Sequence, residues 1–146
     1  MSRMRMKDTA PEPYAALAEA DLLIRKGPLD PALQELVKVR ASQINGCAFC
    51  IDQHTRAAQA LGAGQERIDQ LNQWPESSLF NAAERTALAY AEAVTRMDDV
   101  PDELWGTLKE QFADDQLGHL VLLVALINTY NRVAVPLRMR PPTSAK

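Results

Sequence analysis

The sequence predicts an all-α protein that folds as a single-domain helical bundle of about six to seven helices. Apolar residues recur at helical spacing through most of the chain, and no stretch alternates like a β-strand for more than a few residues. Breaks rich in glycine, proline and asparagine separate these apolar segments at helix-like lengths. With 146 residues, 47% of them hydrophobic, the chain suits one domain with a substantial core. We expect residues 1–146 to form this one domain, with 1–11 and 137–146 as flexible tails.

The first two predicted helices cover about 12–25 and 31–44. Gly27-Pro28 ends the first helix, and Asp30 can cap the second, whose first residue is a proline. The second helix carries a mostly apolar stripe. Glu35 is the exception, a charge close to that stripe, and it is therefore a candidate for a special role.

The third predicted helix, about 47–61, contains both cysteines of the chain and one of its two histidines. Cys47, Cys50 and His54 are three, four and seven residues apart, so they share one face of a helix. Cys47 stands in the first turn, where unpaired N–H groups and the helix dipole favour negative charge. The spacing places two sulfurs within reach of a disulfide and an imidazole close enough to move their protons. This matters because the thiolate, not the thiol, is the nucleophile.

Glu35 and His54 are predicted to meet across a helical hairpin. Asn45-Gly46 is a turn signal between the two helices. At a rise of about 1.5 Å per residue, Glu35 lies roughly 15 Å and His54 roughly 12 Å from that turn. The side chains can therefore contact each other directly or through one water. A carboxylate beside an imidazole fixes its tautomer and favours its protonated form, which predicts a proton relay ending at sulfur.

Four further helices are predicted after Gly62-Ala63-Gly64. They cover about 65–73, Asn81 or Ser78 to Met97, 101–112 and 115–134. The last is apolar on more than one face over 117–127, so its burial is expected to need a subunit partner as well as the chain's own core. The polar residues that follow are interpreted as satisfying the helix's last carbonyl groups rather than lining a pocket; they are Asn128, Tyr130, Asn131 and Arg132. His119 is expected to be a packed or surface residue.

Composition excludes several classes of function. A net charge of −3 provides no basic face for nucleic acid or anionic membrane. The first thirteen residues lack the apolar core of a signal peptide, and the most apolar run, 120–127, is shorter than the roughly 18 residues needed to span a bilayer. The Cys-x-x-Cys pair leaves no cysteine for a secreted disulfide framework. We expect a soluble, cytoplasmic protein with no nucleic-acid or membrane partner and, for lack of a flavin, haem or nucleotide motif, no cofactor.

The stretch 35–62, ELVKVRASQINGCAFCIDQHTRAAQALG, resembles the core of the AhpD-like alkylhydroperoxidases, part of the wider carboxymuconolactone decarboxylase superfamily. The family pattern is a Glu followed after a fixed gap by Cys-x-x-Cys-x-x-x-His, and it is matched by Glu35, Cys47, Cys50 and His54. Segments 81–95 and 123–135 also resemble the family. The resemblance implies an all-helical fold, a homo-oligomer that is often a trimer or hexamer, and peroxide reduction through the cysteine pair.

We therefore expect a thiol-dependent peroxidase-like oxidoreductase that acts on alkyl hydroperoxides, with Glu35, Cys47, Cys50 and His54 as its catalytic residues. A helix dipole contributes about 0.3–1 kcal/mol, whereas a charged histidine can lower a cysteine pKa by several units. Cys50, one turn from His54, is thus the predicted attacking thiol, and Cys47 resolves the product. With no bound redox group, the electrons must come from an external dithiol or thiol-protein reductant.

Four other interpretations of the same residues remain open. The cysteines could be inert core residues, or Cys47, Cys50, His54 and Glu35 could bind zinc, although structural zinc sites usually draw ligands from separated elements. The protein could also be a redox-sensing or scaffold oligomer that switches with its thiol state and turns nothing over. A decarboxylase-like enzyme is disfavoured, because that branch of the superfamily generally lacks the cysteine pair.

Overall fold

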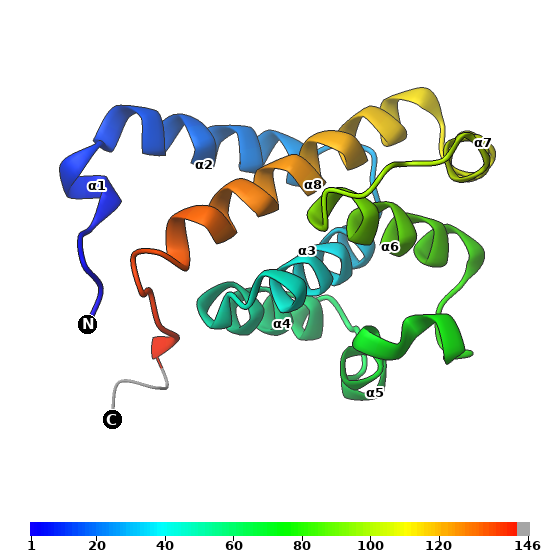
Figure 1. The fold of residues 1–146 in the computed structure, drawn as a ribbon, viewed down its shortest axis with the longest axis horizontal. Coiled ribbons are helices and arrows are strands. Elements are labelled where there is room, and N and C mark those ends of the chain that lie inside the picture. The colour runs from blue at the N-terminus through cyan, green and yellow to red at the C-terminus, as the bar shows by residue number, and fades with distance from the viewer. Residues whose placement is uncertain (143–146) are drawn as a thin grey trace.

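The computed structural model describes residues 1–142, and the predicted all-α single-domain fold is confirmed (Figure 1). None of the described residues lies in a β-strand. Each of the seven predicted helical segments contains a helix: α2 (Pro11–Arg25), α3 (Pro31–Asn45), α4 (Ala48–Ala60), α5 (Gln65–Asp69), α6 (Ala82–Thr95), α7 (Asp102–Gln111) and α8 (Asp114–Ala134).

Helix α3 is the centre of the domain. It packs against α4, α6 and α8, and its residues 33–42 are all buried, the charged ones included. In Figure 1, α2 and α8 run side by side across the upper part of the molecule, while α3 and α4 lie below them. The hairpin that carries the cysteines is therefore held against the long C-terminal helix.

Local capping explains where the central helices begin and end. The Asp30 carboxylate accepts a hydrogen bond from the backbone N–H of Leu33 at 2.9 Å, as expected for the N-cap of α3. Gly46 ends α3 in the left-handed conformation, with φ at 68°, which glycine adopts at little cost. Of the two predicted caps for α6, the structure uses Asn81, which forms a reciprocal capping box with Glu84.

The two segments expected to be flexible tails contact each other. A short helix, α1 (Met6–Thr9), lies within the first segment, and α2 already begins at Pro11. The backbone N–H of Arg3 donates to the carbonyl of Leu137 at 2.9 Å. These are contacts between the two ends of the chain, which local sequence patterns do not reveal. Residues 143–146 of the predicted C-terminal tail lie outside the described residues.

The segment predicted as one helix over 65–73 is instead two elements. Helix α5 ends at Asp69, and a 3₁₀ helix, η1 (Leu71–Glu76), follows and includes Pro75. The Arg85 guanidinium on α6 donates to the carbonyl oxygens of Trp74, Pro75 and Ser77. This tight turn is thus stabilised by hydrogen bonds from another helix.

Helix α8 is long and apolar enough to cross a membrane by length and composition alone, a test that core helices of soluble proteins also pass. In this fold it packs against α2, α3, α6 and α7, and Leu120, Leu123 and Ile127 are almost completely buried. Within one chain α8 is not buried on every side, because Leu122 remains 59% exposed. Leu22 and Leu23 of α2 are also exposed.

Candidate functional site

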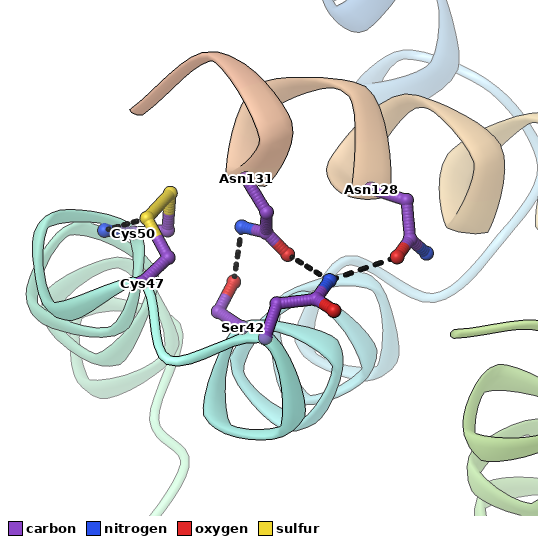
Figure 2. The surroundings of a disulfide bond; sticks show 6 residues. Ser42, Cys47, Cys50, Asn128 and Asn131 are labelled. Atoms are coloured by element: carbon purple, nitrogen blue, oxygen red, sulfur yellow. Dashed lines mark hydrogen bonds between the residues drawn. A yellow bond between two sulfur atoms is a disulfide. The ribbon is translucent and has the colours of Figure 1, made fainter. Parts of the chain in front are cut away.

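The cysteine pair lies at the junction of α3 and α4. Cys47 is the N-cap of α4, one position before the expected first turn, and its sulfur accepts a hydrogen bond from the backbone N–H of Cys50 at 3.3 Å. The two cysteines form a disulfide with their Cα atoms 5.3 Å apart (Figure 2). Both residues are buried, Cys47 at 2% and Cys50 at 3% exposure. Ala134, Phe49 and Met139 pack around the pair.

Glu35 and His54 meet directly. Nδ1 of His54 lies 2.8 Å from Oε2 of Glu35, across the α3–α4 hairpin, as the spacing of the two residues from the Asn45-Gly46 turn predicts. Because an ionised carboxylate only accepts hydrogen bonds, Nδ1 carries the proton, and Nε2 of the neutral ring is the nitrogen able to accept another. The contact therefore sets the tautomer that a base acting on a thiol requires.

The charge network extends beyond the residues that the motif predicts. Lys38, one turn after Glu35 on α3, places Nζ 3.5 Å from Oε1 of Glu35 and 3.3 Å from Oδ1 of Asp21 on α2. Burial opposes ionisation of Glu35, but the His54 hydrogen bond and the Lys38 charge outweigh it and hold its pKa below the ordinary range. Glu35 is therefore an anion at neutral pH although it is buried.

A cavity of about 310 Å³ connects the sulfur to this network. Cys50 and His54 line it from α4, and Lys38 lines it from α3, whereas Glu35 lies behind His54 and Lys38. Most of the remaining wall is apolar or aromatic. It comes from α2, α8 and the segment after α8, and from Phe49 of α4; its members include Tyr14, Ile24, Ile127, Tyr130 and Met139. Cys47 is not among the lining residues of this cavity in the described part of the chain. Among the described residues, the cavity is therefore bordered by one of the two cysteines, Cys50.

The polar residues near the end of α8 do more than satisfy helix carbonyl groups. Asn128 donates to the carbonyl oxygen of Val124 at 2.9 Å, as that interpretation expects, but members of the set also bond to α3 or line the cavity. The amide nitrogen of Asn45 donates to the side-chain oxygens of Asn128 and Asn131 at 2.8 and 2.9 Å. Asn131 in turn donates to the hydroxyl of Ser42 at 3.0 Å, a contact visible in Figure 2. Ser42 also accepts the backbone N–H of Cys47 through its carbonyl group. These hydrogen bonds fasten the turn before the cysteines to α8, while Tyr130 faces the cavity.

Lys38 and Asp21 are the residues that the sequence analysis missed. The available signal was a lysine three residues after Glu35 on the same helical face, in a helix with few charges. Its partner Asp21 lies on α2, and no local pattern links the two. His119, by contrast, is half-buried as expected, with Nδ1 2.7 Å from the carbonyl of Asp115 and its ring against Gly27.

The four predicted site residues are therefore brought together, in two bonded pairs. The zinc interpretation needs two free thiolates, and in this state each sulfur is bonded to the other. Within residues 1–142, no group of three or more His, Cys, Asp or Glu side chains has an arrangement that could hold a metal ion.

Comparison with known proteins relates this chain to one family. The model of the carboxymuconolactone decarboxylase family matches residues 9–93. YdfG of Bacillus subtilis (strain 168), an uncharacterized protein, is 34% identical over 140 residues, which cover 94% of this chain and 95% of YdfG.

Two solved structures show how closely the fold is shared. ATU0492 of Agrobacterium tumefaciens, a protein of unknown function whose name proposes an AhpD antioxidant defence role, has a TM-score of 0.93 and 31% identity, covering 97% of this chain and 99% of its own. The debrominase Bmp8 has a TM-score of 0.84 and 17% identity, covering 94% of this chain and 75% of its own. The second likeness concerns the fold alone, since proteins with one fold can differ in chemistry.

Proposed function

The chain is an AhpD-like member of the carboxymuconolactone decarboxylase family, and on this basis we propose that it is a thiol-dependent peroxidase that reduces organic hydroperoxides through Cys50 and Cys47. The observation that carries the proposal is that Cys50 and His54 line the same cavity, with Glu35 bonded to the far side of the imidazole. A buried thiol with an oriented base and a cavity for substrate are the parts that such chemistry requires.

The first step is attack on the peroxide. In the reduced protein, His54 accepts the proton of the Cys50 thiol, and the thiolate attacks the outer oxygen of the hydroperoxide. The O–O bond breaks, Cys50 becomes a sulfenic acid, and the departing alkoxide takes the proton from His54 and leaves as an alcohol. Glu35 stabilises the protonated imidazole between these two transfers.

The second step closes the disulfide. The Cys47 sulfur attacks the Cys50 sulfur, the S–O bond breaks, and hydroxide leaves as water with the proton of the Cys47 thiol. In total, one hydroperoxide and two thiols give one alcohol, one water and one disulfide. An external dithiol or thiol protein then restores both thiols by disulfide exchange and is itself oxidised. Such reductants maintain thiols in the cytoplasm, which is where we place the protein.

The choice of Cys50 as the attacking thiol has support from the cavity. Cys50 lines it and Cys47 does not, in the described part of the chain. His54 is also on the face of α4 that Cys50 occupies, one turn away. An incoming peroxide therefore meets the Cys50 sulfur and the base together.

We also propose that the protein is a homo-oligomer, a trimer or a hexamer. The exposed leucines Leu22 and Leu23 of α2 and Leu122 of α8 lie on two helices that pack together. Apolar surface left on a monomer promotes aggregation, whereas a second copy of the chain would bury it. Light scattering at micromolar concentration tests this, and a stable, soluble monomer would contradict it.

A second function, redox sensing without turnover, is favoured by one observation. Both cysteines are at most 3% exposed, which hinders the approach of a protein reductant to the disulfide. The two functions differ in stoichiometry. Peroxide consumption is measured with excess dithiol reductant: many equivalents per chain identify an enzyme, and a single equivalent per chain identifies a sensor. A chain with both cysteines changed to serine is the control for uncatalysed loss of peroxide.

A further inference from the structure

Lys38 is a buried cation with no place in the motif. Its side chain is 4% exposed, and its ammonium group lies between Asp21 of α2 and Glu35 of α3, at 3.3 and 3.5 Å. Removing a lysine from water is costly unless carboxylates surround it. A hydrophobic residue would fill the same volume without that cost, so the charge itself calls for an explanation.

The two oxygens of Glu35 have different partners. Oε2 faces Nδ1 of His54, and Oε1 faces Nζ of Lys38. The negative charge of Glu35 is consequently divided between the imidazole of His54 and the ammonium group of Lys38. The more strongly Lys38 interacts with the Glu35 carboxylate, the less strongly that carboxylate stabilises the protonated form of His54.

We propose that Lys38, itself held by Asp21, is a positioning residue for the thiol chemistry: it keeps Glu35 ionised with one oxygen turned to His54, and it weakens Glu35's hold on the His54 proton. This inference rests on the proposed peroxidase function, because it concerns the same base. Asp21 works in the opposite direction, since it neutralises part of the Lys38 charge and is itself bonded to Arg25 at 3.0 Å.

Other charged and titratable groups share this environment and enter the interpretation of any pH profile. From the elements around the cavity they are Tyr14, Asp21 and Arg25 of α2, Glu35 of α3, Cys50 and His54 of α4, and Tyr130 of α8. Helix α6 packs on another side of α3, where its Glu92 bonds to Arg40 rather than to Lys38.

The alternative is that Lys38 simply ties α2 to α3. The test separates the two by charge. Carboxyl titration of Glu35 is followed by carbon NMR in the reduced protein, with the signal assigned by its absence from Glu35→Gln. Lys38→Met should raise the Glu35 titration midpoint by about one pH unit, because a cation that stabilises the carboxylate is gone. Asp21→Asn should lower the Glu35 titration midpoint, because Asp21 then no longer neutralises part of the Lys38 charge.

Activity supplies the second readout. Initial oxidation of Cys50 by an organic hydroperoxide should slow about 3- to 10-fold at pH 7 in Lys38→Met, because His54 releases its proton to the departing oxygen less readily. Lys38→Arg should restore most of the rate, and Lys109→Met, at an exposed lysine of α7, should match the parent.

The outcomes divide cleanly. A tether would give lower thermal stability in both Lys38→Met and Asp21→Asn, with the Glu35 midpoint unmoved, and that result would overturn the inference. If Lys38→Met does not fold, Asp21→Asn and Lys38→Arg still decide the direction of the shift.

Opposite midpoint shifts without any peroxide consumption by the parent would keep the role of Lys38 at the Glu35–His54 pair and reject the peroxidase function. Peroxide turnover with unmoved midpoints would reject the role of Lys38 alone.

Discussion

Two ion clusters on α3 are alike in construction and different in what they can do. Glu35 bonds to His54 and Lys38 beside the cavity. On another side of the helix, Glu92 of α6 accepts from Arg40 at 2.8 Å and from the Trp74 indole at 2.9 Å. In both carboxyls, burial is outweighed by hydrogen bonds and nearby cations, and the pKa is held below the ordinary range.

The difference lies in the partners. Arg40, Trp74 and Arg96 around Glu92 keep their protons throughout the neutral range, so that cluster has a fixed charge. His54 can gain or lose a proton, and it stands in the wall of a cavity beside a thiol. A lowered carboxyl pKa therefore does not identify a catalytic carboxylate. What separates the Glu35 cluster from the Glu92 cluster is a titratable partner, His54, in the wall of a cavity.

The largest expected effect comes from replacing the two cysteines beside the Glu35–His54–Lys38 cluster. Cys50→Ser should abolish peroxide consumption and leave Cys47 with little sulfenic acid. In Cys47→Ser turnover should also stop, but Cys50 should still form a sulfenic acid that dimedone traps, detected by mass spectrometry. A label found mainly on Cys47 of Cys50→Ser, with Cys50 of the other variant unreactive, would reverse the assignment.

Matched carboxamide variants test the comparison directly. Glu35→Gln should keep the fold and slow thiol oxidation about 100-fold, with an altered pH profile, because the imidazole loses its charge partner. Glu92→Gln should keep the rate per folded molecule and lower the free energy of unfolding by about 2–4 kcal/mol, because Arg40 is left largely buried without its anion.

Denaturant titration and peroxide kinetics on the same two preparations supply the measurements. Each variant serves as the other's control for the general effect of losing a buried carboxylate. If Glu92→Gln slowed oxidation as much as Glu35→Gln, the division into a structural and a chemical cluster would be wrong.

The smallest expected effect is one that both clusters share. A carboxyl whose pKa is lower in the folded than in the unfolded chain stabilises the fold above the unfolded value, about 4.3 for glutamate, and that contribution is lost as the pH falls through the folded value. The melting temperature of the parent should therefore drop below about pH 4 more steeply than that of Glu35→Gln or Glu92→Gln. Curves that stay parallel down to pH 3 would contradict the lowered pKa values.

The sequence could predict those contacts that depend on one helical hairpin. Glu35 and His54 meet because their distances from the Asn45-Gly46 turn are similar. The cysteines bond because they are three residues apart, at the N-cap and in the first turn of α4. Seven helical segments also followed from spacing and breaks. Each of these inferences uses only local geometry.

Contacts between segments far apart in the sequence could not be predicted from local geometry. Asn45 bonds to Asn128 and Asn131 across most of the chain, and neither the hydrogen bond nor its direction follows from either segment alone. The same holds for Lys38, whose burial depends on α2 bringing Asp21 to it. The turn of η1 is set by Arg85 of another helix, so local pattern merged it with α5.

The wall around the disulfide has a consequence for how the protein is made. Ala134 and Met139, which pack on Cys47 and Cys50, come much later in the sequence than the cysteines. During translation the two thiols therefore leave the ribosome well before the residues that shield them. A growing chain, or one cut short before Ala134, carries an unprotected dithiol that cellular oxidants and other proteins' cysteines can reach.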